Sequence, residues 1–480
     1  MGIRVSGADD RGRCFTPFGV LDAAPVPSHT VVYITTRCAS RNNFSDNSVL
    51  PVIFVRGTPG ANRGAPMADV IHPTFDNTAT APATPTLTAT GGVVETPAVM
   101  LYTRLRKSPY FWKSRERGVA AYSVYNHTYH PRHYGDPVGE YWSLLHGVTV
   151  WDVGVERQLE ISGPDAFDFT NMLIPRDLTK CEVGQCKYVF VTAPDGGIIN
   201  DPVLLRLEEN RFWLSLADSD VGLWAQGLAH AGGWDVELRE ADVAPLQIQG
   251  PRAKQVMTDL FGADILDVPY YRLREFDLDG MRVVVSRTGY SGEVGYEIYL
   301  HDASRDAGRL WDAVWEAGEP HGLRPIGPCH IRRIEAGMLA YGCDITLDTN
   351  PLEVGYDYHW MVDLDQEADF VGKEALRRAR ETGISRLMVG VEIGGRPLGS
   401  YNDGSMIEPF PVYSAGTTPV GSVTSACYSP RLDRNIGLAM VPIGLSTAGT
   451  ELTVGTPDGA RGALVVEKPF IDPRKETPKL

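Results

Sequence analysis

The 480-residue sequence is poor in cysteine and contains no long apolar run. Its seven cysteines are scattered, and the one close pair, Cys181 and Cys186, has no second pair to complete a metal site. An odd, unpaired set of cysteines is typical of a reducing compartment. No stretch approaches the ~18 apolar residues of a membrane span, and the N-terminus lacks the order of a signal peptide. We therefore expect a cytoplasmic protein.

Basic residues are also in short supply. The chain has 45 Lys and Arg against 60 Asp and Glu, which gives a formal net charge of −15 at pH 7. Nucleic acids and anionic membranes both require a basic face on their partner. The composition therefore predicts neither nucleic acid nor membrane as a main partner. The hydrophobic content of 43% is ordinary for a globular protein of two or three domains.

Periodic patterns are missing from residues 1–99. The segment 76–99 is a low-complexity stretch of Thr, Ala and Pro, which cannot bury enough apolar surface to order itself. The composition predicts a disordered extension. Alternatively, Met100 is the true start of the protein and the upstream residues are a gene-model artefact.

Strands and helices mix from Leu101 onward. β-rich runs at 187–192, 198–207 and 211–216 are separated by short turns, which predicts an antiparallel meander. A further strand is expected at 281–286, and helices at 306–318 and 371–382. After Ser385 only short strands remain between Gly, Pro and Asn turns, the pattern of a small β-barrel or jelly roll. The fold class predicted is α+β with an appended β domain.

Two stretches carry candidate binding residues. Tyr188 and Asp201 flank a tight turn, and a hairpin can bring such a pair into one cleft. The glycine-rich stretch 287–299 suggests close backbone approach to a ligand, with Glu297 and Tyr299 on one face of the following strand. Each has a plainer interpretation: a solvated turn aspartate beside a half-buried tyrosine, and an ordinary glycine-rich turn.

Two other stretches are rich in aromatic or charged residues. Residues 122–134 hold four tyrosines and three histidines, but the spacing does not predict a metal site. An aromatic pocket wall is the better interpretation. Arg333 and Glu335 lie on an expected short helix with small residues, which favours a buried ion pair that serves packing.

The order of these motifs carries a resemblance. TGYSGEVGYE, which contains Glu297, resembles the T-G-Y-T-G-E-x-G-x-E signature of the glycine-cleavage aminomethyltransferases, and RIEAGMLAYG resembles their R-L-E-A-G-M-x-x-Y-G. LQIQGPRA and DGGIIND fit the same family in order. The chain is still more similar to the dimethylsulfoniopropionate demethylases, in stretches such as VTVWDVGVERQLEISG and TSACYSP. The resemblance covers roughly residues 103–472 in order.

The resemblance implies a three-domain cloverleaf of the aminomethyltransferase fold. Residues 100–384 would be the folate-binding region, in two subdomains, and 385–480 the C-terminal β-barrel domain. Tetrahydrofolate would be the cofactor and a small methyl donor the partner. The implied folate contacts are Tyr188, Asp201, Val203, Glu297, which anchors the pterin, and Tyr299. Asp201 would also be catalytic, by positioning the cofactor and assisting proton loss from its N5 atom.

The resemblance also implies a set of residues that bind the methyl donor, most of them aromatic. Tyr271 and Tyr290 fall where the demethylases place aromatic side chains near the sulfonium, and Tyr125, Asn126 and Tyr129 belong to the first loop. Aromatic faces suit an onium cation.

The chain departs from the demethylases in two places. It reads N-H-T-Y-H-P at 126–131 where they read N-H-M-L-L-P, and Tyr290 replaces a tryptophan. Glu293 stands in a stretch where they carry a lysine. If Glu293 points inward, it would favour a cation and disfavour a carboxylate; if it faces water, specificity is unchanged.

The function expected is transfer of a methyl group from dimethylsulfoniopropionate, or a related onium compound, to N5 of tetrahydrofolate. One alternative is a glycine-cleavage aminomethyltransferase, which would need a lipoyl carrier protein; the Pro-Cys-His at 328–330 in place of their A-R-D argues against it. Another is an O-demethylase of methoxy-aromatics. A folate-binding iron–sulfur assembly factor would carry K-G-C-Y-x-G-Q-E, which is absent.

Overall fold

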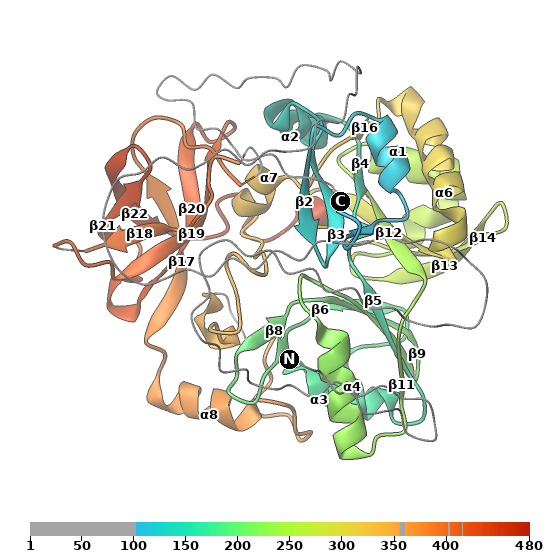
Figure 1. The fold of residues 1–480 in the computed structure, drawn as a ribbon, viewed down its shortest axis with the longest axis horizontal. Helices are drawn as coiled ribbons and strands as arrows, with labels where there is room; N and C mark the ends of the chain where they lie inside the picture. The colour runs from blue at the N-terminus through green and yellow to red at the C-terminus, as the bar shows by residue number, and fades with distance from the viewer. Residues whose placement is uncertain (1–101, 356–360, 402–403, 415) are drawn as a thin grey trace, which may run out of the picture. The chain divides into compact units, whose positions relative to one another are not determined.

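The computed structural model describes residues 102–480, except 356–360, 402–403 and 415. The extension predicted at 1–99 lies outside the described residues. Within the described part, mixed helices and sheets are followed by a closed barrel of six strands (Figure 1). This arrangement confirms the predicted α+β fold with a C-terminal β-barrel. In the part of the chain that the structure describes, no helix has the length and apolarity to cross a membrane.

The first large sheet has five antiparallel strands. Their order is β11 (Glu237–Glu240), β5 (Gln158–Ser162), β10 (Arg211–Ser215), β9 (Val203–Glu208) and β6 (Gln185–Tyr188). Helices α3 (Ala166–Leu173) and α4 (Val221–Gly232) contribute their apolar faces to the core on this sheet. Because β6 pairs with β9 and β9 with β10, the predicted meander is confirmed.

The extent of two predicted runs is corrected. β7 (Val191–Thr192) and β8 (Ile198–Asn200) leave the meander and pair with each other as a separate two-stranded sheet. Pro202 has no N–H to donate to a ladder, so the run breaks between β8 and β9. The break leaves Asp201 in a short loop between two strands.

The second large sheet has six strands. Their order is β13 (Leu273–Leu278), β14 (Met281–Ser286), β15 (Gly295–His301), β12 (Val243–Gln249), β4 (Thr149–Asp152) and β16 (Arg324–Pro325). Helices α5 (Ala253–Phe261) and α6 (Ala303–Gly318) pack into its core. The strand predicted at 281–286 has the same bounds in the structure, and the helix predicted at 306–318 begins earlier, at Ala303.

A small sheet lies near the start of the described chain. It consists of β1 (Arg106–Lys107), β3 (Thr128–His133) and β2 (Ala121–Tyr125), with helices α1 (Phe111–Glu116) and α2 (Pro137–His146). Asn126 and His127 connect β2 to β3 with φ angles of 49° and 57°. Two successive left-handed residues are the conformation of a type I′ hairpin turn, which asparagine tolerates well.

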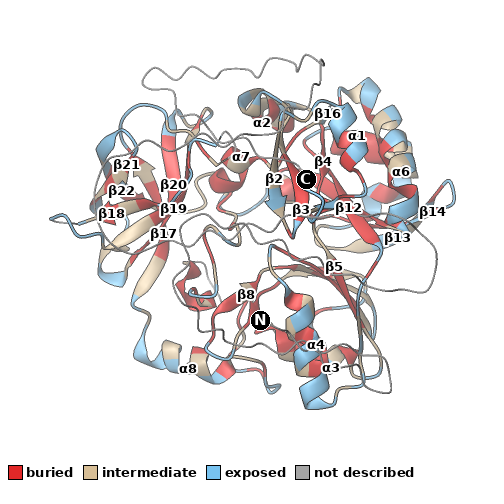
Figure 2. Ribbon diagram, viewed as in Figure 1, coloured by how far each residue is buried: buried red, intermediate tan, exposed pale blue. Residues whose placement is uncertain are grey.

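The C-terminal barrel closes through six antiparallel strands. Their order is β17 (Arg386–Ile393), β20 (Arg434–Pro442), β19 (Gly421–Ser429), β18 (Phe410–Tyr413), β21 (Glu451–Thr456) and β22 (Gly459–Val466). The short helix α7 (His330–Glu335) packs on β19 and β20. α8 (Lys373–Thr382) precedes the barrel and exposes much of its surface, whereas β20 is buried along almost its whole length (Figure 2).

Candidate active site

Glu297 lies in the middle of β15, between β12 and β14, and its side chain is only 3% exposed. Its cross-strand neighbours are Gln247 and Ser286, so the same face of the sheet is polar here. The Glu297 carboxylate accepts hydrogen bonds from Gln247 Nε2 (2.7 Å), from the Tyr299 hydroxyl (3.0 Å) and from the Thr288 hydroxyl. No basic side chain in the described ranges forms an ion pair with it, and burial raises its pKa.

Asp201 is held in place by its neighbour in the chain. The Asn200 amide donates to the Ala217 carbonyl and accepts from the Ala217 N–H, both at 2.9 Å. The Tyr188 hydroxyl, on β6, donates to Asp201 Oδ2 at 2.8 Å. Burial raises the pKa of Asp201 to about 7, although the bond from Tyr188 opposes the shift. Asp201 can therefore hold or release a proton near neutral pH.

Four tyrosines surround these two carboxyl groups. The pKa of the Tyr125 hydroxyl is raised by burial and by the nearby Asp201. Tyr290 interacts with the same carboxylate and donates its hydroxyl to the Leu339 carbonyl at 2.8 Å. Tyr271 lies near Glu297, and the Tyr188 side chain interacts with both Tyr290 and Tyr271. The structure thus brings together seven of the residues predicted for the site: Tyr125, Tyr188, Asp201, Tyr271, Tyr290, Glu297 and Tyr299. Val203, the eighth, pairs with Tyr188 across β9 and β6.

Two predicted substrate residues, Asn126 and Tyr129, make contacts within the protein. Tyr125 on β2 pairs with Thr128 on β3, so these two side chains lie on one face of the sheet. Tyr129 follows Thr128 and therefore faces the opposite side. Tyr129 is 1% exposed and packs on Phe111, with ring centroids 6.0 Å apart. The Asn126 amide donates to the carbonyls of Val155 (3.2 Å) and Leu216 (3.0 Å) and so fixes the turn. The prediction that Tyr129 lines the substrate pocket is therefore not supported by its position.

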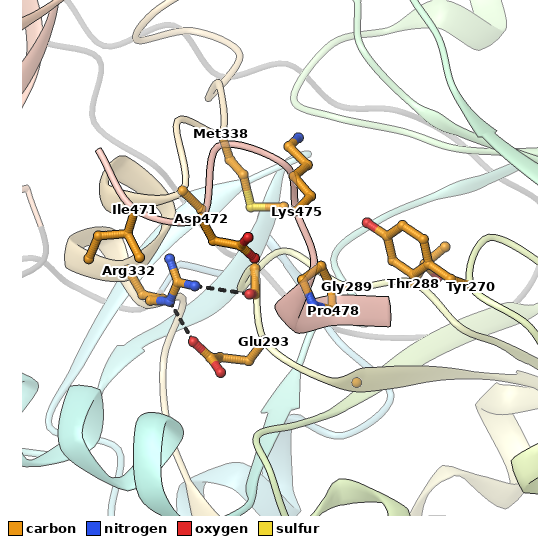
Figure 3. A pocket seen from close by; sticks show the side chains of 13 residues that line it. Tyr270, Thr288, Gly289, Glu293, Arg332, Met338, Ile471, Asp472, Lys475 and Pro478 are labelled. Atoms are coloured by element: carbon orange, nitrogen blue, oxygen red, sulfur yellow. Dashed lines mark hydrogen bonds and ion pairs between the residues drawn. The ribbon is translucent and has the colours of Figure 1, made fainter. Parts of the chain in front are cut away.

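Glu293 takes neither of the two positions expected for it. Its carboxylate is buried and accepts from Arg332 Nε at 2.7 Å, and Arg332 also donates to the Gly292 carbonyl (Figure 3). A cavity of about 20 Å³ lies beside this pair, lined also by Asp472 and Lys475 near the chain end. That volume holds about one water molecule, so it is too small for a pterin or a methyl donor.

The ion pair expected within 333–342 forms with other partners. Arg333 Nη1 contacts Asp344 at 2.5 Å, and Glu335 accepts from Arg431 at 2.8 Å. Asp344 also accepts from the hydroxyls of Thr424 and Ser425 on β19, both at 2.6 Å. These bonds join α7 to the barrel, so this cluster has a structural role.

Glu156 is a site residue that the sequence motifs did not single out. Its carboxylate accepts from the Ser215 hydroxyl at 2.7 Å. Burial, the nearby Glu297 and Asp201 raise its pKa to about 8. It is a lone glutamate just before a strand, and neither periodicity nor spacing marks it, so only the tertiary contacts could identify it.

The chain matches two family models. The GCVT N-terminal domain matches residues 113–366, and the glycine cleavage T-protein C-terminal barrel domain matches residues 402–472. A curated relative, the dimethylsulfoniopropionate demethylase of Ruegeria pomeroyi, is 36% identical over 364 residues, which are 76% of this chain and 97% of the relative. The aminomethyltransferases of Symbiobacterium thermophilum and Bacillus subtilis are 34% and 32% identical, over 71% and 69% of this chain and 90% of each relative.

A solved structure supports the fold. The glycine cleavage system aminomethyltransferase T of Bartonella henselae aligns with a TM-score of 0.67 over 77% of this chain and 99% of its own, at 23% identity. Both domains, the curated relatives and the fold agree with the motifs around Glu297 and Arg333. The chain therefore belongs to the glycine cleavage T-protein family, which includes the aminomethyltransferases and their demethylase relative.

Proposed function

We propose that this protein transfers a methyl group from a small onium compound, such as dimethylsulfoniopropionate, to N5 of tetrahydrofolate. The observation that carries the proposal is the group of carboxyl residues, Asp201 and Glu297 foremost, that lies among tyrosines without a basic partner in the described structure. The 36% identity to a dimethylsulfoniopropionate demethylase supports the same reaction.

The residues around Glu297 suit the edge of a pterin ring. That edge presents several N–H donors, which a buried carboxylate binds by charge-assisted hydrogen bonds. Gln247 donates its Nε2 to Glu297, and its Oε1 is buried without a hydrogen-bond partner in the described part of the chain. A buried acceptor left open in this way is expected where a ligand completes the bonding. Glu297 and Gln247 would therefore hold the pterin, with Tyr299 fixing the carboxylate.

Asp201 would manage the proton of the reaction. Bound tetrahydrofolate supplies a secondary amine nucleophile at N5. With a pKa of about 7, Asp201 can accept the N5 proton at neutral pH. The Tyr188 hydroxyl, at 2.8 Å, holds the aspartate oriented and stabilises its charged form. Val203, beside Tyr188 in the sheet, would contact the bound cofactor.

The tyrosines would bind and orient the methyl donor. Tyr125, Tyr271 and Tyr290 can attract an onium cation by ~1–2 kcal/mol per ring. A methyl group on a sulfonium is already activated because a neutral thioether leaves. The protein needs mainly to align donor and acceptor in line and to exclude water. Glu293 would take no part, because Arg332 already compensates its charge.

A second candidate function is aminomethyl transfer of the glycine-cleavage type. The aminomethyltransferase of Symbiobacterium thermophilum covers 71% of this chain at 34% identity, nearly as much as the demethylase. That reaction would take its substrate from a lipoyl carrier protein and give 5,10-methylenetetrahydrofolate and ammonia.

One assay separates the two candidates. Purified protein is incubated with tetrahydrofolate and either dimethylsulfoniopropionate, trimethylsulfonium, glycine betaine or a methoxybenzoate, and 5-methyltetrahydrofolate is measured by mass spectrometry. We expect product with an onium donor, and its formation at least about 100-fold slower with the Asp201→Asn variant. Release of ammonia from an aminomethylated lipoyl carrier, with no methyl product from any donor, would support the second candidate instead.

A further inference from the structure

Glu156 lies just before β5 and faces the same site as Glu297. Its Oε2 accepts from Ser215 Oγ, on β10, at 2.7 Å. The Gln158 amide also donates to Ser215 Oγ, at 2.8 Å, which fixes the serine. The Glu156 side chain interacts electrostatically with Glu297 and Asp201 from two other elements.

Two hydroxyl groups connect Glu156 to Glu297. Ser215, which donates to Glu156, also lies beside the Tyr299 hydroxyl and interacts with it. Tyr299 in turn donates to Glu297 Oε2 at 3.0 Å. Each carboxyl group thus accepts from one of two neighbouring hydroxyls, from β10 and β15. When Glu156 carries a proton it can donate to Ser215, whose hydroxyl is then free to donate to Tyr299, and this completes the chain to Glu297.

Arg157 is adjacent to Glu156 in the sequence, but its guanidinium does not pair with Glu156 or Glu297. Arg157, the next residue, turns away and pairs with Asp220 (3.1 Å) and Glu240 (2.8 Å). The titratable groups that face Glu156 are Glu297, Asp201, Tyr125 and Tyr299, which are all acidic or neutral. Two carboxyl groups without a counter-charge in a desolvated site hold a proton between them.

We propose that Glu156 is a second pterin-binding residue, which shares one proton with Glu297 so that the pair presents both a carboxylate and an O–H donor to the ring. The inference rests on the proposed function, since it assumes that a pterin occupies this site. A pterin edge alternates N–H donors with ring-nitrogen and carbonyl acceptors. Two carboxylates could match only the donors, whereas a carboxylate with a carboxylic acid matches both.

The shared proton makes folate binding depend on pH. The pKa of Glu156 is raised to about 8 by burial, by Glu297 and by Asp201. Below that pH the pair keeps its proton and binds the pterin. Above it the pair loses its donor and gains an uncompensated charge. The affinity for tetrahydrofolate is therefore expected to fall about fivefold over the first pH unit above 8, and by about tenfold for each further unit.

The test is tetrahydrofolate binding by full-length protein, measured anaerobically by calorimetry between pH 6.5 and pH 9. We expect wild-type affinity to fall about fivefold between pH 8 and pH 9. Glu156→Gln keeps a donor and cannot ionise, so its affinity at pH 6.5 should stay within about threefold of wild type and change little by pH 9. Glu208→Gln, at an exposed ion pair with Arg211, is the matched control and should follow the wild type.

A second measurement needs no folate. A folded-state pKa of about 8 for a glutamate means that the folded protein keeps a proton which the unfolded chain loses near pH 4.3, so wild-type stability falls as pH rises from about 4.3 to 8. Glu156→Gln should show a smaller fall in melting temperature over that range. Ser215→Ala, which leaves both carboxyl groups in place, should weaken folate binding without removing its pH dependence.

The outcomes separate the two claims. Identical pH profiles for wild type and Glu156→Gln, in binding or in melting temperature, would overturn the shared proton while leaving the proposed function intact. A wild type that binds no tetrahydrofolate at any pH would overturn both.

Discussion

Glu160 and Glu297 are two glutamates that are equally buried, one in each of the two large sheets. Each lies within a strand and is 3% exposed. The cross-strand neighbours of Glu160 are Trp213 and Arg239. Glu160 forms ion pairs with Arg239 at 2.5 Å and with Arg211 at 2.9 Å. Burial alone would raise the pKa of Glu160, but the bonds from Trp213 and the two arginines lower it.

Glu297 has neighbours of another kind. Gln247, Thr288 and Tyr299 satisfy its oxygens with neutral donors, and burial raises its pKa. A buried acid that is compensated by cations has a structural role in its sheet. The buried ion pair of Arg333 and Asp344 has such a role at the barrel. A buried acid without cations costs stability, and such groups cluster at functional sites. The comparison gives Glu160 a structural role and supports the proposal that Glu297, Asp201 and Glu156 bind a ligand.

The largest effect is expected from Asp201→Asn. The amide cannot accept a proton from N5, so kcat for methyl transfer should fall by roughly 100- to 10,000-fold, while thermal stability is kept or increased because a desolvated acid is removed. Steady-state kinetics and a thermal melt measure both. Asp312→Asn, at an exposed ion pair with Lys113, is the control and should change kcat by less than about twofold. An active Asp201→Asn enzyme would contradict the assignment.

Glu160→Gln tests the compensated acid. Its removal leaves two arginines without their common partner, so the free energy of unfolding should fall by about 3 kcal/mol. Urea denaturation measures this loss, and Glu208→Gln, whose side chain is 65% exposed, should cost less than ~1 kcal/mol. The folate affinity of the folded Glu160→Gln protein should equal that of wild type. A loss of folate affinity in Glu160→Gln without a loss of stability would show that Glu160 acts in ligand binding and not in the structure.

Glu297→Gln should lose folate affinity and keep its stability, the opposite of Glu160→Gln. Replacing the carboxylate by an amide removes charge-assisted bonds to the pterin, worth ~1.5–3 kcal/mol. Tetrahydrofolate binding should therefore weaken by roughly 10- to 100-fold, with no loss of stability. Calorimetry at pH 7 measures the affinity. Unchanged binding would show that Glu297 does not anchor the pterin.

The smallest kinetic effect is expected from Glu293→Gln. Because Arg332 already compensates Glu293 inside the protein, kcat/KM for dimethylsulfoniopropionate should change by less than about twofold. The melting temperature should fall, because Arg332 is 1% exposed and loses the nearer of its two acidic partners, keeping Glu335 at 4.0 Å. A large change in donor specificity would mean that Glu293 reaches the methyl donor after all.

Local patterns accounted for much of the fold and for pairs of residues close in sequence. Alternation along a strand placed Glu297 and Tyr299 on one face, where they are joined at 3.0 Å. Tyr188 and Asp201, which the hairpin pattern allowed to meet, are joined by a hydrogen bond of 2.8 Å. Strand content after Ser385 predicted the closed barrel. The roles of Tyr188, Asp201 and Glu297 in binding folate stay predictions.

Which charges meet which was decided only by the tertiary structure. Nothing in the local sequence distinguishes Glu160, which meets arginines from two other strands, from Glu156, which meets none in the described structure. Glu293 finds Arg332 on α7, and Tyr129 turns from the site because it is one residue away from the face of Tyr125. Local periodicity sets the face of a side chain, but charge compensation depends on residues that are distant along the chain and adjacent only after folding.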